Sequence, residues 1–390
     1  MKKKILFLSP LPPPIYGSNL SSLTCLKVIQ QHPNFEVKNI QLNHPAKFID
    51  LNKITLGKLF GGLILIGKTL AAVNRFKPDL IYIMPSTGGF SFIRDFGAAL
   101  TFKLLNQRVI YHLRTQLCDG DLNNGVKSFI LKNAFKDSAA IVLGKELMEG
   151  VNKYIPAEQI KILPNAIRKT LSDGEFQSIQ KERLKTPKLR LLFLSNMIKE
   201  KGWPQAIETA RILKDRDCDF DMTFAGSWPS RAEEIEFQTL VEEYGLQEFV
   251  RHIGFIKGKK KQTTLAQSDL LIFPTAYRYE ALPRVIIEAM EYGLPVIANS
   301  TAAIPSTIVD AYTGFLLVEN TPQEIVEKID LMHSKQKIAE MGRNARQRYA
   351  DHYELEILRK SFISILNDQL HGQPNGSAVN GSQAVRTNNT

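Results

Sequence analysis

Cysteine is scarce in this sequence, and what little there is shows no metal-ligand spacing. The three cysteines are Cys25, Cys118 and Cys218. This usage argues against a disulfide framework or a cysteine-based zinc module, and it predicts a reducing, cytoplasmic setting.

Long hydrophobic runs are also missing. The most apolar segment, 59–73, is broken by three glycines and by Lys68, and it is too short to cross a bilayer. The chain starts MKKKILFLSP, which superficially imitates a signal peptide, but its apolar run covers only residues 5–8. We therefore expect a buried first strand there and no cleaved leader.

Two kinds of nucleotide-binding signature are absent as well. No Gly-x-Gly-x-x-Gly follows the first expected strand, which argues against a dinucleotide oxidoreductase. No zinc finger and no aromatic RNA-binding signature is present, so nucleic acid is not expected as a partner.

The charge that is present is distributed unevenly. The 390 residues carry a net charge of +11. Residues 1–168 hold 22 Lys and Arg against 10 Asp and Glu, a surplus of 12, whereas residues 169–390 hold 28 against 29. A basic half joined to a neutral half suggests a surface that faces something anionic, although a merely soluble basic surface is the simpler alternative.

The length fits two domains, and short apolar runs alternate with helical patterns in both halves. This alternation predicts parallel sheets covered by helices on both faces. The expected strands are 5–8, 37–41, 80–84, 109–113 and 140–143 in the first half, and 189–194, 220–225, 250–253, 270–273 and 296–298 in the second.

The segment from Tyr279 to Ser300, YEALPRVIIEAMEYGLPVIANS, is the most informative part of the chain. It predicts a loop, a helix that begins near Pro283, and a buried strand. Glu280 then lies on the loop and Glu288 about two turns into the helix. A helix start favours phosphate, and carboxylates accept hydrogen bonds from sugar hydroxyls, so the chemistry is that of a nucleotide-sugar site.

This segment resembles the signature of the retaining glycosyltransferases of family 4. The resemblance implies an α/β GT-B fold, in which two doubly wound Rossmann-like domains face each other across a cleft. It also implies that Glu280 holds the transferred sugar, that Glu288 accepts from the ribose hydroxyls, and that the backbone at Leu282 and Pro283 faces the diphosphate.

The segment that follows residue 188 is similar to the opening of the family's second domain. Lys201 and Gly202 fit the Lys-Gly of that motif, and Lys201 is expected to place a charge on the diphosphate. The family's Gly-Arg pair is Ser195-Asn196 here. Asn196 can hydrogen-bond a phosphate oxygen but brings no charge, so the expected two-cation clamp is weakened.

Three further positions match the family more loosely. Gly17 remains from a glycine-rich loop that lies near the diphosphate. His112, with Arg114 behind it, ends a strand where the family often has a histidine facing the sugar. Ile256 falls in the segment that binds the base, and the lysines that follow it, including Lys259–Lys261, are interpreted as a solvated loop.

One departure concerns a glutamate that many relatives carry after Gly-Gly-x-Pro. The corresponding residue here is Ser306, so the role of that acid is in doubt. The expected domains are 1–168 on the acceptor side, a linker at 169–188, and 189–353 on the donor side. Residues 354–371 are expected to form a helix that crosses back to the first domain, and 372–390 a disordered tail.

Together these patterns predict a retaining enzyme that moves a sugar from a nucleoside diphosphate donor to an acceptor hydroxyl. Glu280, His112 and Lys201 are the expected catalytic residues. No metal or other cofactor is expected, because no Asp-x-Asp motif stands in a metal-binding context and the helix dipole and lysine take its place. An epimerase on the same fold and a non-catalytic nucleotide-sugar-binding protein are the alternatives.

The acceptor is expected to be a glycan or a lipid-linked intermediate of a surface polysaccharide. The apolar stretch from Lys53 to Lys77, with Lys58, Lys68 and Arg75, is expected to lie on an anionic membrane. The protein would then be a peripheral one on the cytoplasmic face of the plasma membrane. The alternative is that this stretch simply covers the sheet.

Overall fold

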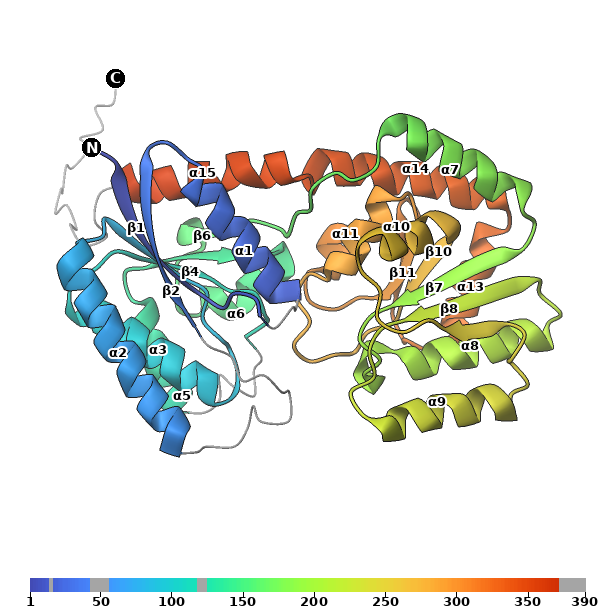
Figure 1. Cartoon of the computed structure of the whole chain (residues 1–390), viewed down its shortest axis with the longest axis horizontal. Helices are drawn as coiled ribbons and strands as arrows, with labels where there is room; N and C mark the ends of the chain where they lie inside the picture. The colour runs from blue at the N-terminus through green and yellow to red at the C-terminus, as the bar shows by residue number, and fades with distance from the viewer. Residues whose placement is uncertain (14–16, 43–55, 118–124, 372–390) are drawn as a thin grey trace, which may run out of the picture.

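The computed structural model describes residues 1–13, 17–42, 56–117 and 125–371 (Figure 1). Lys53, Cys118 and the predicted tail lie outside these residues. The described chain forms two parallel six-stranded sheets with helices on both faces, which confirms the predicted α/β architecture of two doubly wound domains.

The first sheet has the strand order β2-β1-β3-β4-β5-β6. Its central strands β3, β4 and β5 are buried at every residue, as a parallel sheet covered on both faces requires. The strands are β1 (Lys3–Ser9), β2 (Phe35–Gln41), β3 (Leu80–Ile83), β4 (Val109–His112), β5 (Ala139–Val142) and β6 (Ile160–Ile162). The helices are α1 (Gly17–Gln30), α2 (Leu56–Phe76), α3 (Gly89–Leu104), α5 (Gly125–Phe135) and α6 (Met148–Asn152).

The second sheet has the order β12-β11-β10-β7-β8-β9. Its strands are β7 (Leu189–Leu194), β8 (Phe220–Ala225), β9 (Val250–His252), β10 (Leu270–Phe273), β11 (Val296–Asn299) and β12 (Gly314–Leu317). The helices of this half are α7 (Asp173–Lys185), α8 (Trp203–Asp215), α9 (Arg231–Glu243), α10 (Gly258–Gln267), α11 (Arg284–Glu291), α12 (Ile304–Thr307), α13 (Pro322–Met332) and α14 (Lys335–His352).

The last helix, α15 (Leu355–His371), runs back from the second domain to the first (Figure 1). Its apolar side chains Leu358, Phe362 and Leu366 are buried in the same cluster as residues of β1 and α1. The crossing is fixed at its start, because the backbone N–H of Ile167 donates to the Tyr353 carbonyl over 3.1 Å.

The predicted linker 169–188 contains an element that the sequence analysis did not expect. Helix α7 begins with a capping box, in which Ser172 and Glu175 bond each other's backbone N–H groups. Arg183 of α7 donates to the Tyr292 and Gly293 carbonyls behind α11, over 2.9 and 3.1 Å. The polar sequence that indicated a linker is therefore a helix that packs on the second domain.

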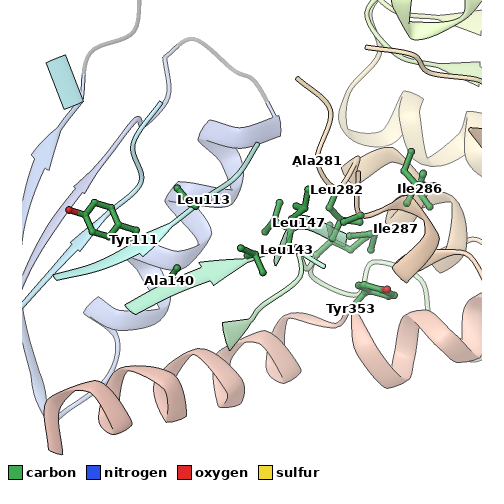
Figure 2. Packing of buried hydrophobic residues seen from close by; sticks show 14 of the residues in the cluster. Tyr111, Leu113, Ala140, Leu143, Leu147, Ala281, Leu282, Ile286, Ile287 and Tyr353 are labelled. Atoms are coloured by element: carbon green, nitrogen blue, oxygen red, sulfur yellow. The ribbon is translucent and has the colours of Figure 1, made fainter. Parts of the chain in front are cut away.

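One hydrophobic cluster continues across the junction of the two domains. Figure 2 shows Leu143 and Leu147 of the first domain beside Ala281, Leu282 and Ile287 of the second. All five are buried. The loop that leads into α11 is therefore held from both domains.

Candidate functional site

The two residues predicted to act on the donor follow strands that are neighbours only in space. Strands β7 and β10 are adjacent in the second sheet, and the chain leaves β7 toward β8 but leaves β10 toward β11. The loops at their carboxyl ends diverge at such a switch point, where doubly wound sheets bind ligands. Lys201 lies beyond β7 and Glu280 beyond β10.

Lys201 and Glu280 form an ion pair. Lys201 Nζ donates to Glu280 Oε2 over 2.6 Å, and both side chains are largely buried. Thr275 Oγ1 donates to the same carboxylate oxygen over 3.2 Å. The Lys201 ammonium also lies 4.3 Å from the centre of the Tyr277 ring, and burial together with the Glu280 charge raises the pKa of that tyrosine to about 12.

Gly202 explains why the lysine reaches the other loop. Its φ of 93° is in the left-handed region, and a Cβ there would lie 2.4 Å from the Pro274 carbonyl oxygen. A glycine at this position therefore lets the start of α8 approach the end of β10. The Ala276 N–H donates to the Glu200 carbonyl over 2.8 Å, which joins the two loops directly.

Glu288 lies one turn inside α11 and is paired with a residue from a third element. Lys261 Nζ of α10 is 2.5 Å from Glu288 Oε2. The sequence interpretation of Lys261 as part of a solvated loop is wrong, because the lysine lies on a helix and faces this carboxylate. Glu288 is 27 positions from Lys261 in the sequence, so only the packing of α10 beside α11 reveals this pair.

Pro283 is the N-cap of α11, as the sequence predicted for a helix start, and both Leu282 and Pro283 are buried. The Leu282 carbonyl accepts from Asn165 Nδ2 over 2.7 Å. The first turn of α11 carries no acidic residue, so its positive end is not neutralised locally. Asn165, in the loop after β6, was not identified from the sequence.

On the first domain, Gly17 is the first residue of α1 and lies opposite α11. A Cβ on Gly17 would be 3.7 Å from Cδ of Arg284. The structure thus brings Gly17 to the same junction as Leu282 and Pro283.

His112 is buried at the end of β4 in the first domain. Its side chain is 1% exposed, and its Nδ1 is 2.5 Å from the hydroxyl of Tyr82. Burial, and to a smaller extent the charge of Arg114, lower the pKa of His112 well below its usual range, so the ring is neutral at physiological pH. Arg114, two residues later, donates to the side chain of Asn165 and so reaches the junction.

Asn196 and Ile256 occupy different environments. Asn196 is exposed in the loop after β7, where a Cβ on the neighbouring Gly226 would overlap the Ser195 carbonyl. Ile256 is buried between β9 and α10, whereas Phe255 beside it is 57% exposed. The roles of both residues in donor binding stay predictions.

Ser306, in place of the expected acid, contacts an acid of the other domain. Its hydroxyl donates to Glu146 Oε2 over 2.5 Å, and the Lys145 N–H donates to Ser306 Oγ over 3.4 Å. The serine therefore links α12 to the first domain.

Metal-ligating residues do not gather in the described parts of the chain. Residues 1–13, 17–42, 56–117 and 125–371 include no group of three or more His, Cys, Asp or Glu side chains that could hold a metal ion. Whether the reaction uses a metal stays untested. Within these same residues no helix is both long and apolar enough to span a bilayer.

The two doubly wound domains, with a last helix that returns to the first, have the GT-B fold. Residues 174–348, from α7 into α14, match the family described as Glycosyl transferases group 1. The match covers less than half of the chain and contains Lys201, Glu280 and Glu288. Together, this match and the fold support a glycosyltransferase with the GT-B fold.

The chain is similar to several proteins from bacteria. It is 26% identical over 292 residues to an uncharacterized 41.2 kDa protein in the cps region of Klebsiella pneumoniae, covering 72% of this chain and 74% of that one. It is 26% identical over 250 residues to the amylovoran biosynthesis glycosyltransferase AmsK of Erwinia amylovora, covering 60% and 59%. Among solved structures, Anabaena Alr3699/HepE in complex with UDP and glucose superposes with a TM-score of 0.70 at 18% identity, covering 94% and 99%.

Proposed function

We propose that the protein is a retaining glycosyltransferase that moves a sugar from a nucleoside diphosphate donor to a hydroxyl of a glycan or lipid-linked acceptor. The observation that carries this proposal is the Lys201–Glu280 ion pair at the β7/β10 switch point. The relatives' names, amylovoran biosynthesis among them, support a role in the assembly of a surface polysaccharide.

In this mechanism the protein works mainly by electrostatics. Negative charge builds on the leaving diphosphate as the bond to the sugar breaks, and fixed positive groups at that point lower the barrier. Lys201 and the start of α11 supply them. Glu280 accepts hydrogen bonds from the sugar and orients it, while Glu288 accepts from the ribose hydroxyls.

The proposal is tested by incubating the protein with UDP- and GDP-sugars without an acceptor. We expect slow hydrolysis that releases nucleoside diphosphate and a free sugar whose first anomer, seen by NMR, is that of the donor. Release of the opposite anomer would contradict retention. Conversion to an epimeric nucleotide sugar without nucleoside diphosphate would favour the epimerase, and binding without any turnover would favour the non-catalytic alternative.

We further propose that the first domain holds the enzyme on the cytoplasmic face of an anionic membrane. Leu65, Ala72 and Val73 of α2 are buried against the sheet, which accounts for one face of this helix. Its other face exposes Phe60 and Leu63, at 69% and 67%. Helix α3 packs on α2, and α5 packs on α3 (Figure 1). These two helices add three exposed apolar residues, Ile93 of α3 and Val126 and Phe129 of α5.

The same helices carry exposed cations. Lys68 and Arg75 lie further along α2, and Lys132 lies on α5. An apolar patch on helices that also carry basic residues matches an anionic leaflet, into which the apolar side chains insert while the cations meet the headgroups.

Leu63→Asp and Phe129→Asp should each reduce sedimentation with phosphatidylglycerol vesicles by about 10-fold, because each removes one inserted apolar side chain. Binding of the unaltered protein should fall with added salt and be absent with phosphatidylcholine alone. Leu331→Asp is the matched control, since Leu331 is 57% exposed on α13 of the other domain. If the unaltered protein binds neither vesicle, the acceptor is better explained as a soluble molecule.

A further inference from the structure

Two arginines from different domains meet at the junction beside α11. Arg284, the first residue of α11, donates through Nη1 to Ser21 Oγ of α1 and to the Ala166 carbonyl, each over 3.3 Å. Arg114, just after β4, donates to the side chain of Asn165. The two guanidinium groups therefore bind consecutive residues of the same loop.

Neither arginine makes a direct ion pair with an acid in the described part of the chain, and the Glu288 charge acts on Arg284 only from a distance. Across residues 1–13, 17–42, 56–117 and 125–371, no carboxylate forms an ion pair with Arg114 or Arg284, and their partners are a hydroxyl, a carbonyl and an amide. Glu288, one turn along α11 from Arg284, is paired with Lys261 instead.

The electrostatics of this pair are unfavourable without an anion. Burial lowers the pKa of both arginines, and the charge of Arg284 lowers the pKa of Arg114 further, whereas the charge of Glu288 partly offsets the effect of burial on Arg284. Both groups stay charged because the guanidinium pKa starts so high. Two like charges held together away from water raise the free energy of the empty site, and a bound anion recovers that free energy.

The surroundings offer further buried hydrogen-bonding groups. Nε of Arg114 and Nε2 of His112 are both buried, and neither has a hydrogen-bond partner within the described part of the chain. The first turns of α1 and α11 contain no acidic residue. Gly17, at the start of α1, leaves space beside the Arg284 side chain, because even a Cβ there would only be in van der Waals contact.

We propose that Arg284 and Arg114 form a phosphate-binding subsite at the domain junction, which takes a phosphate or diphosphate group of a substrate. Arginine suits this ligand because its planar fork pairs with two phosphate oxygens at once. The subsite supplies the second cation that Asn196 does not. Its substrate assignment rests on the proposed function, whereas the anion site itself does not.

The test measures the binding of inorganic pyrophosphate by calorimetry, with no sugar and no turnover. Arg284→Gln and Arg114→Gln are each expected to weaken pyrophosphate binding by about 10- to 100-fold, the effect of one charged hydrogen bond. Arg284→Lys keeps the charge and should lose less affinity than Arg284→Gln. Arg343→Gln, on the exposed face of α14, is the matched control and should bind as the unaltered protein does.

Several results would overturn the subsite. One is that the unaltered protein shows no measurable pyrophosphate binding, and another is that both folded glutamine variants keep its affinity. Equal losses of affinity for Arg284→Lys and Arg284→Gln would indicate that Arg284 has a purely structural role. Circular dichroism and thermal unfolding establish that each variant is folded.

Competition identifies where the phosphate comes from. If UDP or GDP displaces pyrophosphate, the subsite holds the donor's diphosphate. If pyrophosphate binds beside a saturating nucleoside diphosphate, the subsite holds a phosphate of the acceptor. Either result supports an anion site at the two arginines. Because the measurement needs no transfer, the site can stand even if the proposed reaction fails.

Discussion

Lys201→Ala is expected to slow sugar transfer at saturating donor by about 10²- to 10³-fold, or ~2.7–4 kcal/mol. The lysine is the cation at the β7/β10 switch point, 2.6 Å from Glu280, and a charge placed beside the leaving diphosphate acts mainly in the transition state. Its removal should therefore lower kcat more than it raises KM. Steady-state kinetics with the identified donor measure this.

Lys199→Ala is the matched control for this variant. Lys199 lies two residues earlier in the same turn, but it is half-exposed and pairs with Glu236 at 2.7 Å. Its loss should leave kcat unchanged within about twofold, because an exposed pair contributes little. A Lys201→Ala enzyme with the rate of the unaltered protein would remove Lys201 from the mechanism.

Glu280→Gln is the second change with a large expected effect, a loss of about 10²-fold in kcat with a smaller change in donor KM. Glutamine keeps the size of the side chain but loses the negative charge that holds the sugar hydroxyls and balances Lys201. Because Lys201 and Glu280 touch, the Lys201→Ala/Glu280→Gln double variant should lose less than the sum of the two single losses.

Glu288→Gln separates donor binding from turnover. Glu288 lies on α11 behind the loop, paired with Lys261, and is expected to contact the ribose. The variant should weaken donor affinity by about 10-fold and leave kcat nearly unchanged. Equal losses of kcat in the two glutamine variants, or none in either, would contradict the roles assigned to the two glutamates.

Much of the architecture followed from local patterns. Short apolar runs predicted five strands of each sheet, because parallel strands covered on both faces need apolar side chains. The edge strands β6 and β12 were not predicted. Pro283 and Gly293 predicted the limits of α11, and the observed helix ends at Glu291, within the expected segment. Helix α7 was missed because its polar sequence packs through a few side chains, Phe176 and Arg183 among them.

The candidate site was predicted in part. Glu280, Glu288, Leu282 and Pro283 stand in one segment, so their spacing was visible in the sequence. His112 was chosen by position at a strand end; the structure shows its Nδ1 against the Tyr82 hydroxyl, and its catalytic role stays a prediction.

The sequence by itself determined most of the elements, the two-domain class and the signature loop, because each depends on residues close together in the chain. Only the tertiary structure decided which charges meet. Lys201 and Glu280 are 79 positions apart and come together because β7 and β10 are neighbours in the sheet. Arg114 and Arg284 approach because the two domains pack on each other, and such long-range proximity leaves no periodic trace in the sequence.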